Sequence, residues 1–198
     1  VVESATSVSP SVGADLFYKG LVAMLYAIIG ILIYIGLRFD FRYSPGAVVA
    51  LIHDTLITLG IFSLFGIKFT LPIISALLTI IGYSLNDTIV VYDRIRENLT
   101  KFRGMAMGKL VNQSINETLS RTILTSITTL FVVTSLLFLG GGLIVDFALA
   151  LTIGVVVGTY SSVFIASPVV IHLDAYFEGR KTQAKQQNRP GAGSTATA

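Results

Sequence analysis

The chain has 198 residues, of which 53% are hydrophobic and only 13% are charged. Soluble domains carry about 25% charged residues, so this composition excludes a soluble globular domain and a disordered chain. The absence of cysteine excludes disulfides and thiolate-bound zinc, and the small net charge of +3 does not indicate a nucleic-acid partner.

Five segments are apolar over the roughly 20 residues that a helix needs to cross a bilayer. In chain order they are 16–37, 47–67, 69–91, 122–139 and 147–171. Short glycine-containing turns separate the second from the third and the fourth from the fifth, which predicts two antiparallel hairpins. Five such segments in so short a chain argue against the alternative of buried helices in a soluble core. The sequence therefore predicts an all-α membrane protein, a helical bundle of five transmembrane helices.

The two ends differ from this bundle in composition. Residues 1–15 are polar, begin with valine and contain no signal peptide, so we expect an upstream segment to carry them across the membrane. Residues 1–6 resemble the last strand of a β-containing domain, which predicts that 1–15 are the remnant of a periplasmic domain. Residues 172–198 are predicted to form a disordered cytoplasmic tail, because Gly, Ala, Gln and Thr dominate its end.

The basic residues predict the orientation of the bundle. All of the 14 lysines and arginines except Lys19 and Lys68 fall on one side of the five spans. By the positive-inside rule this side is cytoplasmic, which places the N-terminus outside and the C-terminus inside.

The loop between the third and fourth spans, 94–121, is also predicted to be cytoplasmic. Apolar residues recur there at roughly helical spacing: Met105, Leu110, Val111, Ile115 and Leu119. This pattern predicts an amphipathic cytoplasmic helix at the membrane interface. Such a helix is either a surface connector or a docking site for a partner.

Two aspartates lie inside predicted spans, where charged side chains are costly and are usually functional. Asp54 falls in the second span, next to His53, and shares a helix face with Ala50 and Thr58. We expect this small, polar face to pack against other helices.

Asp87 falls in the cytoplasmic half of the third span, next to Asn86. Ser84, Asp87 and Thr88 share one face, whereas Asn86 points elsewhere. Burial disfavours the charged form of a carboxylate, which suits a residue that takes up and releases a proton. The alternative is a purely structural role, in a hydrogen bond between helices or an ion pair with Arg94.

Arg121 directly precedes the fourth span and starts a polar seam that continues at four-residue intervals with Thr125 and Thr129, with Thr122 and Ser126 beside them. An arginine that approaches or leaves a carboxylate changes its proton affinity, so Arg121 is a candidate partner of the aspartates. It is equally well explained as an ordinary positive-inside anchor.

The fifth span carries Gly154 and Gly158 on one face, which allows another helix to approach closely. Together with the polar faces at Asp54 and Asp87, this seam exceeds what five helices need for their own packing. We therefore expect it to contact a membrane partner.

The sequence does not indicate an enzyme. Residues 82–87 read GYSLND, which differs from the Gly-x-Gly-Asp loop of intramembrane aspartyl proteases. His53 and His172 lie in different parts of the bundle and predict no metal site. There is no phosphate-binding loop either, so we expect no cofactor and an ion gradient as the energy source.

Four strings resemble signature segments of the SecF family of bacterial protein-export membrane proteins, within the SecD/SecF group of the RND superfamily. They are SVGADL at 11–16, ALIHD at 50–54, GYSLNDTIVVYDRIREN at 82–98 and NETLSRTILTS at 116–126. The seventeen-residue string is the most specific of them, and the resemblance extends over nearly all of residues 9–171.

The resemblance implies the membrane half of an RND-type bundle that lacks the first span and the periplasmic domain. It implies SecD, the SecYEG channel, other Sec accessory membrane proteins and preproteins as partners, in the bacterial inner membrane. In the family, the proton-motive force promotes the export of preproteins. Asp87 matches the family's transport aspartate, Arg121 its functional arginine, and Asp54 a further acidic residue.

Two other functions are compatible with such a bundle. A small-molecule efflux transporter of the same superfamily would carry an Asp-Asp pair on one helix, and this sequence has none. A passive structural subunit would use the polar residues only to join helices, and it would keep its function when Asp87 is made neutral.

Overall fold

The structure is a computed structural model that describes residues 10–38, 44–67 and 70–187. Its helices are α1 (Pro10–Arg38), α2 (Ser44–Leu64), α3 (Leu71–Lys101), α4 (Met107–Leu139), α5 (Leu143–Ser161), a π-helical turn (Ser162–Ala166) and α6 (Ser167–Gln187). Over these residues there is no β-strand. Five stretches are long and apolar enough to cross a membrane, the last of them running through α5, the π-helical turn and the start of α6. The predicted all-α bundle with five spans is thus confirmed.

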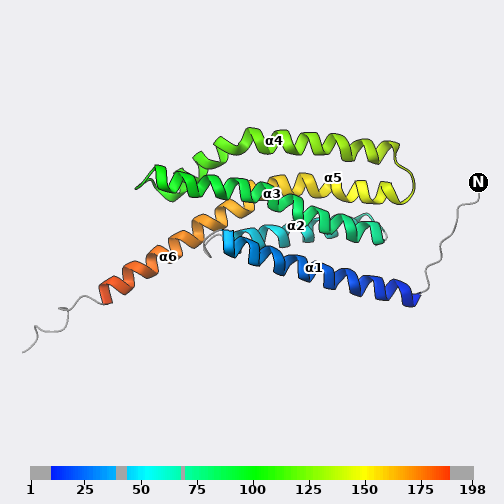
Figure 1. The fold of residues 1–198 in the computed structure, drawn as a ribbon, viewed down its shortest axis with the longest axis horizontal. Coiled ribbons are helices and arrows are strands. Elements are labelled where there is room, and N and C mark those ends of the chain that lie inside the picture. The colour runs from blue at the N-terminus through cyan, green and yellow to red at the C-terminus, as the bar shows by residue number, and fades with distance from the viewer. Residues whose placement is uncertain (1–9, 39–43, 68–69, 188–198) are drawn as a thin grey trace, which may run out of the picture.

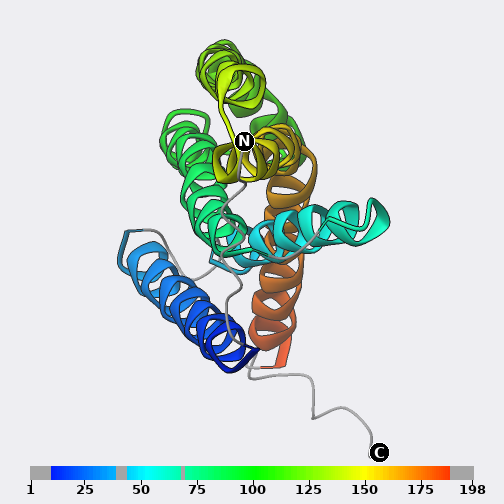
Figure 2. The ribbon, with the colours of Figure 1, turned by 90° about the vertical axis from the view of Figure 1, so that its right-hand side faces the viewer.

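The helices α1 to α5 run along one long axis, with α3 in the middle of the bundle (Figure 1). α3 packs against α5, α4 and α2, whereas α1 contacts α2 and α3 at the edge. Seen end-on, α1 and α4 lie on opposite sides of the bundle (Figure 2). Two clusters of buried apolar side chains hold the helices together, one around Phe62, Ile80 and Leu151 and the other around Tyr92, Ile95 and Leu110.

Most of the predicted loop 94–121 belongs to the helices α3 and α4. α3 continues to Lys101 and α4 begins at Met107, so only 102–106 connect them. The expected amphipathic segment is therefore the first part of α4 rather than a separate helix at the membrane interface. The physical reason is that its apolar residues Leu110 and Val111 are buried in the same core cluster as Ile95 of α3.

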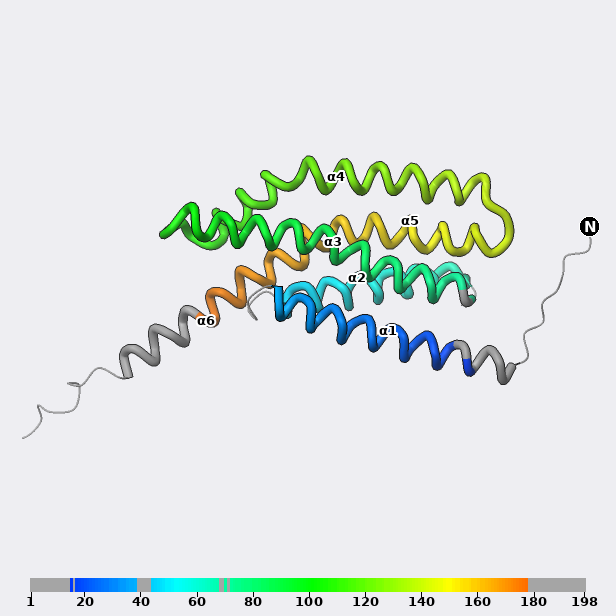
Figure 3. The backbone as a smooth tube through the Cα atoms, in the orientation of Figure 1, coloured from blue at the N-terminus to red at the C-terminus, as the bar shows by residue number. Residues whose placement is uncertain are grey.

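The ends of the chain also differ from the expectation where the structure describes them. α1 starts at Pro10, so residues 10–15 of the predicted periplasmic remnant are helical. α6 continues to Gln187 and leaves the bundle at an angle (Figures 1 and 3), so 172–187 form a helix instead of a disordered tail. Residues 1–9, with the expected strand, and 188–198 lie outside the described residues.

The π-helical turn between α5 and α6 was not predicted from the sequence. Such turns leave main-chain carbonyls without their usual partner, and they often occur at functional sites. Here the Ser167 hydroxyl donates to the Ser162 carbonyl at 3.0 Å, and the Tyr92 hydroxyl donates to the Ala166 carbonyl at 3.2 Å. Tyr92 of α3 is fully buried, so this bond ties the turn to the centre of the bundle.

The glycine seam of α5 faces α3 of the same chain. A Cβ atom at Gly154 would overlap the Ile80 side chain, and one at Gly158 would lie 3.0 Å from the Ser84 Cβ. The expectation that this seam contacts a separate partner is therefore wrong. α3 already occupies the space, because the absent side chains let the two helices approach closely.

We expect Gly154→Ala to destabilise the bundle by about 1–3 kcal/mol, because its Cβ would push into the fully packed Ile80. The matched control is Gly82→Ala on α3, where a Cβ meets nothing within 4 Å. This control should be neutral or slightly stabilising, because alanine favours a helix over glycine. Thermal unfolding of the two purified variants in detergent measures the difference. Equal melting temperatures would show that the α3–α5 contact tolerates a methyl group.

Candidate functional site

Two carboxylates are buried between the helices, Asp54 of α2 and Asp87 of α3. Each residue is only 1% exposed. Their surroundings differ in one respect that decides what each can do: the number of hydrogen-bond donors that reach the carboxylate oxygens.

Asp54 has donors around both of its oxygens. The hydroxyls of Ser84 and Ser161 donate to Oδ2 at 2.5 and 2.7 Å, and Nδ1 of His53 lies 3.0 Å from Oδ1. Ser84 belongs to α3 and Ser161 ends α5, directly before the π-helical turn. Asp54 therefore joins three helices at one point, as expected for a residue that fixes their relative positions.

Asp87 lies one helical turn beyond Ser84, and its Oδ2 has no hydrogen-bond partner although it is buried. The groups that act on Asp87 from α4 are the guanidinium of Arg121, through its charge, and the hydroxyl of Ser126. Buried polar atoms without a partner are rare, and each calls for an explanation such as a catalytic role. Asp87 is thus a buried carboxylate with one oxygen that no donor occupies and that can take up a proton.

Ser126 belongs to a small group of hydroxyls from three helices. Its Oγ lies 2.7 Å from Oγ1 of Thr159 on α5, and the Tyr83 hydroxyl points to it at 3.4 Å. Ser126 and Thr159 also line a groove of about 730 Å³ between α4 and the α5–α6 helix, whose other walls are mostly apolar. Ser126 was predicted from the sequence as part of the polar seam of the fourth span, whereas Thr159 and Tyr83 were not identified; the available signal was the presence of hydroxyls within apolar spans.

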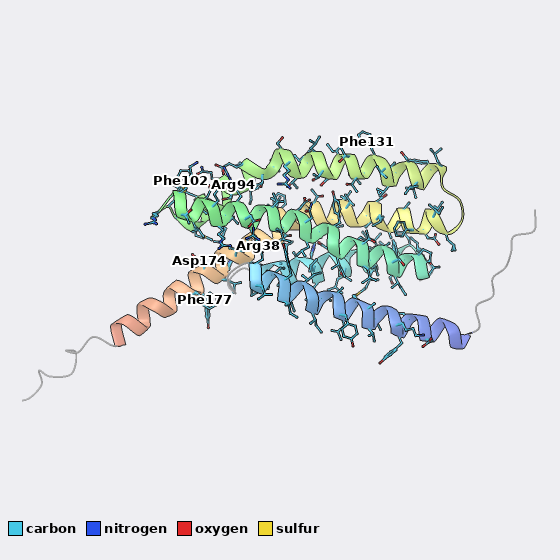
Figure 4. All side chains as sticks on the ribbon, viewed as in Figure 1. Arg38, Arg94, Phe102, Phe131, Asp174 and Phe177 are labelled. Atoms are coloured by element: carbon cyan, nitrogen blue, oxygen red, sulfur yellow. The ribbon has the colours of Figure 1, made fainter. Side chains whose placement is uncertain are left out.

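Arg94 and Arg121, the two arginines considered as partners of Asp87, have different surroundings. Arg94, labelled in Figure 4 at the end of the bundle where α3 meets α4, pairs with Glu97 and Glu117. The alternative of an Asp87–Arg94 pair is therefore not found. Arg121 is exposed, and no ion pair includes it in the described part of the chain.

The remaining predicted site residues have other surroundings. His53 is half-buried with its Nδ1 3.0 Å from Oδ1 of Asp54, and Asn86 is exposed on a different face of α3. Thr125 and Thr129 of the predicted seam donate to carbonyls of their own helix. Within the described ranges, no three His, Asp or Glu side chains gather in a way that could hold a metal ion.

Comparison with known proteins is consistent across sequence and structure. The model of the family described as protein export membrane protein SecD/SecF, C-terminal, matches residues 1–175. A protein translocase subunit SecF of Cereibacter sphaeroides is 50% identical over 92% of this chain, and one of Thermodesulfovibrio yellowstonii is 54% identical over 87%. These alignments cover 56% and 58% of those two proteins, so the chain spans little more than half of their length.

The fold matches a solved structure of the same kind. The crystal structure of SecDF from Thermus thermophilus, described as a translocon-associated membrane protein, superposes with a TM-score of 0.81 at 47% identity. The match covers 85% of this chain and 23% of that one. With the family model over residues 1–175, the shared sequences and the common helical bundle, the chain belongs to the SecD/SecF family of protein-export membrane proteins.

Proposed function

We propose that the protein is an accessory subunit of the Sec protein translocase, which together with SecD uses the proton-motive force to promote preprotein export. Its SecF and SecDF relatives carry the name protein translocase subunit, which supports the translocase role. The observation that carries the proton coupling is Asp87, a carboxylate inside the bundle with one oxygen left without a partner.

In this proposal the two buried aspartates have different roles. Asp87 binds and releases a proton as the bundle alternates between conformations, and Arg121 adjusts its affinity from α4. Asp54 is a positioning residue, because its bonds to Ser84 and Ser161 fix α3 and α5 around Asp87. Moving a charge through the membrane potential supplies about 2.3 kcal/mol per 100 mV, which is enough to bias such a two-state change.

SecD is the partner with the most direct support. The Thermus thermophilus relative is a single chain named SecDF. This chain is 46% identical to it over 92% of the present sequence, which covers 24% of the SecDF chain. The SecYEG channel and preproteins follow from the proposed role in export. The same role implies the bacterial inner membrane, with several spans. The side of the bundle that carries most of the lysines and arginines would face the cytoplasm.

The test is preprotein import into inverted inner-membrane vesicles that contain the full-length protein and SecD, with and without a proton gradient. The proposal expects the gradient to enhance import, and it expects the enhancement to be missing from vesicles depleted of this protein. Equal enhancement in both would show that this protein does not couple the gradient to export. Gradient-driven release of small hydrophobic molecules instead would favour an efflux transporter.

The orientation has its own test, which the cysteine-free sequence makes simple. Lys19→Cys lies near the start of α1, and Arg103→Cys lies in the 102–106 connection. A membrane-impermeant maleimide should label position 19 only from the periplasmic side and position 103 only from the cytoplasmic side. Labelling of both from one side would contradict the five-span orientation.

A further inference from the structure

The charged network at the α3–α4 end surrounds Glu117, and the proposed function does not use it. Glu117 Oε2 accepts from Arg94 Nε at 2.5 Å and from Asn98 Nδ2 at 2.8 Å, and Oε1 accepts from Gln113 Nε2 at 3.0 Å. Asn98 is completely buried and also donates to the Ser114 hydroxyl at 3.0 Å. Every carboxylate oxygen of Glu117 is therefore engaged.

Glu117 also lies four residues, about one turn, before Arg121 on α4. A glutamate four residues before an arginine on the same helix is the favourable order for an ion pair. Nevertheless, no ion pair of Arg121 is present among the described residues, and its charge acts on Asp87. Glu117 is instead bound by Arg94 and Asn98 of α3 and by Gln113 of α4. These bonds compete with an ion pair to Arg121.

We propose that the Arg94–Glu117 pair is a positioning device that keeps Glu117 occupied, so that Arg121 stays available to Asp87. The inference rests on the proposed function, in which Arg121 adjusts the proton affinity of Asp87. Arg94 lies two turns beyond Asp87 on α3, and Glu117 lies one turn before Arg121 on α4. The pair thus connects the two helices that carry Asp87 and Arg121.

The device predicts an unusual pattern of suppression between variants. Arg94→Gln removes the charged donor to Glu117 and leaves only the neutral amides of Asn98 and Gln113, so that Arg121 can compete for this carboxylate. Gradient-dependent import should then fall by about 1.4- to 2.3-fold, the change in equilibrium that an i,i+4 ion pair of about 0.2–0.5 kcal/mol produces. Adding Glu117→Gln should restore it, because no charged group remains to capture Arg121. Arg94→Lys, which keeps a donor and a charge, should retain most of the response.

The experiment measures gradient-dependent import into inverted vesicles for these variants of the full-length protein, after co-purification with SecD shows that each one assembles. Glu97→Gln is the matched control: it removes the other partner of Arg94 but leaves Glu117 held, so import should not change. Glu117→Gln alone should also retain the response, and this holds whether or not Arg94→Gln assembles. A purely structural network predicts the opposite, namely that Glu117→Gln loses the response and that the double variant is no better than Arg94→Gln.

Asp87→Asn serves as the reference in the same assay. If it still responds to the gradient, the proposed function itself fails. If it loses the response while Arg94→Gln keeps it, or while Glu117→Gln loses it, only the positioning device is overturned.

Discussion

Asp87→Asn should abolish the gradient-dependent part of preprotein import while leaving assembly with SecD intact. Asparagine keeps the shape of aspartate but cannot take up a proton. The substitution removes no hydrogen bond from Oδ2, because this buried atom has no partner. Import that depends on ATP alone should continue at the wild-type rate. The measurement is import into inverted vesicles with and without the gradient, for variant and wild type side by side.

The control for this prediction lies on the same helix. Asp93 is six residues beyond Asp87, its side chain is 40% exposed, and it pairs with Arg38 at 3.0 Å. Exposed ion pairs contribute about 0–1 kcal/mol, so Asp93→Asn should import nearly as well as wild type, with the gradient response preserved. Two variants with the same response would mean that the position of the carboxylate in the bundle is irrelevant, and Asp87 would then be a structural residue.

Asp54→Ala should instead destabilise the whole bundle, by about 2 kcal/mol or more. The substitution removes the acceptor that the Ser84 and Ser161 hydroxyls share, and each buried polar group left without a partner costs about 1–3 kcal/mol. Ser161 loses less than Ser84, since its hydroxyl also lies 3.2 Å from the Gly158 carbonyl. Thermal unfolding in detergent measures the loss, and the yield of the complex with SecD should fall in parallel.

Two further variants make this second prediction specific. Asp54→Asn keeps one acceptor oxygen and should fall between wild type and Asp54→Ala. Thr55→Val, on the same helix, removes only a bond to the Leu51 carbonyl and should have little effect. If Asp54→Ala melts at the wild-type temperature, the three-helix connection contributes nothing to stability and the positioning role of Asp54 is wrong.

The spans could be predicted from the sequence because membrane insertion depends on local composition. A run of about 20 apolar residues is sufficient to indicate a helix, whatever its neighbours are. At 94–121 the helical periodicity correctly predicted a helix, but it placed this helix at the membrane interface, whereas Leu110 and Val111 are buried against α3. Periodicity indicates which face of a helix is apolar, but it does not identify what covers that face. The π-helical turn could not be predicted for a related reason: the hydroxyl that binds its Ala166 carbonyl belongs to Tyr92, 74 residues away in the chain.

The candidate site could be predicted only one helix at a time. Charged residues in apolar spans are conspicuous, so Asp54, Asp87 and Arg121 were found directly from the sequence. Their different environments depend on side chains from other helices, such as Ser161 of α5 beside Asp54 and Ser126 of α4 beside Asp87. No spacing within one span carries that information. The glycine seam shows the same limit: close packing was predicted, but its partner, α3, was not.

The central claim is that Asp87, and not Asp54, exchanges a proton. Infrared difference spectroscopy of the full-length protein with SecD, on lowering the pH, measures this directly through the carbonyl band of a protonated carboxyl group. We predict that the band appears in wild type and in Asp54→Asn and is lost in Asp87→Asn. A band that persists in Asp87→Asn and disappears in Asp54→Asn would contradict the assignment and exchange the roles of the two aspartates.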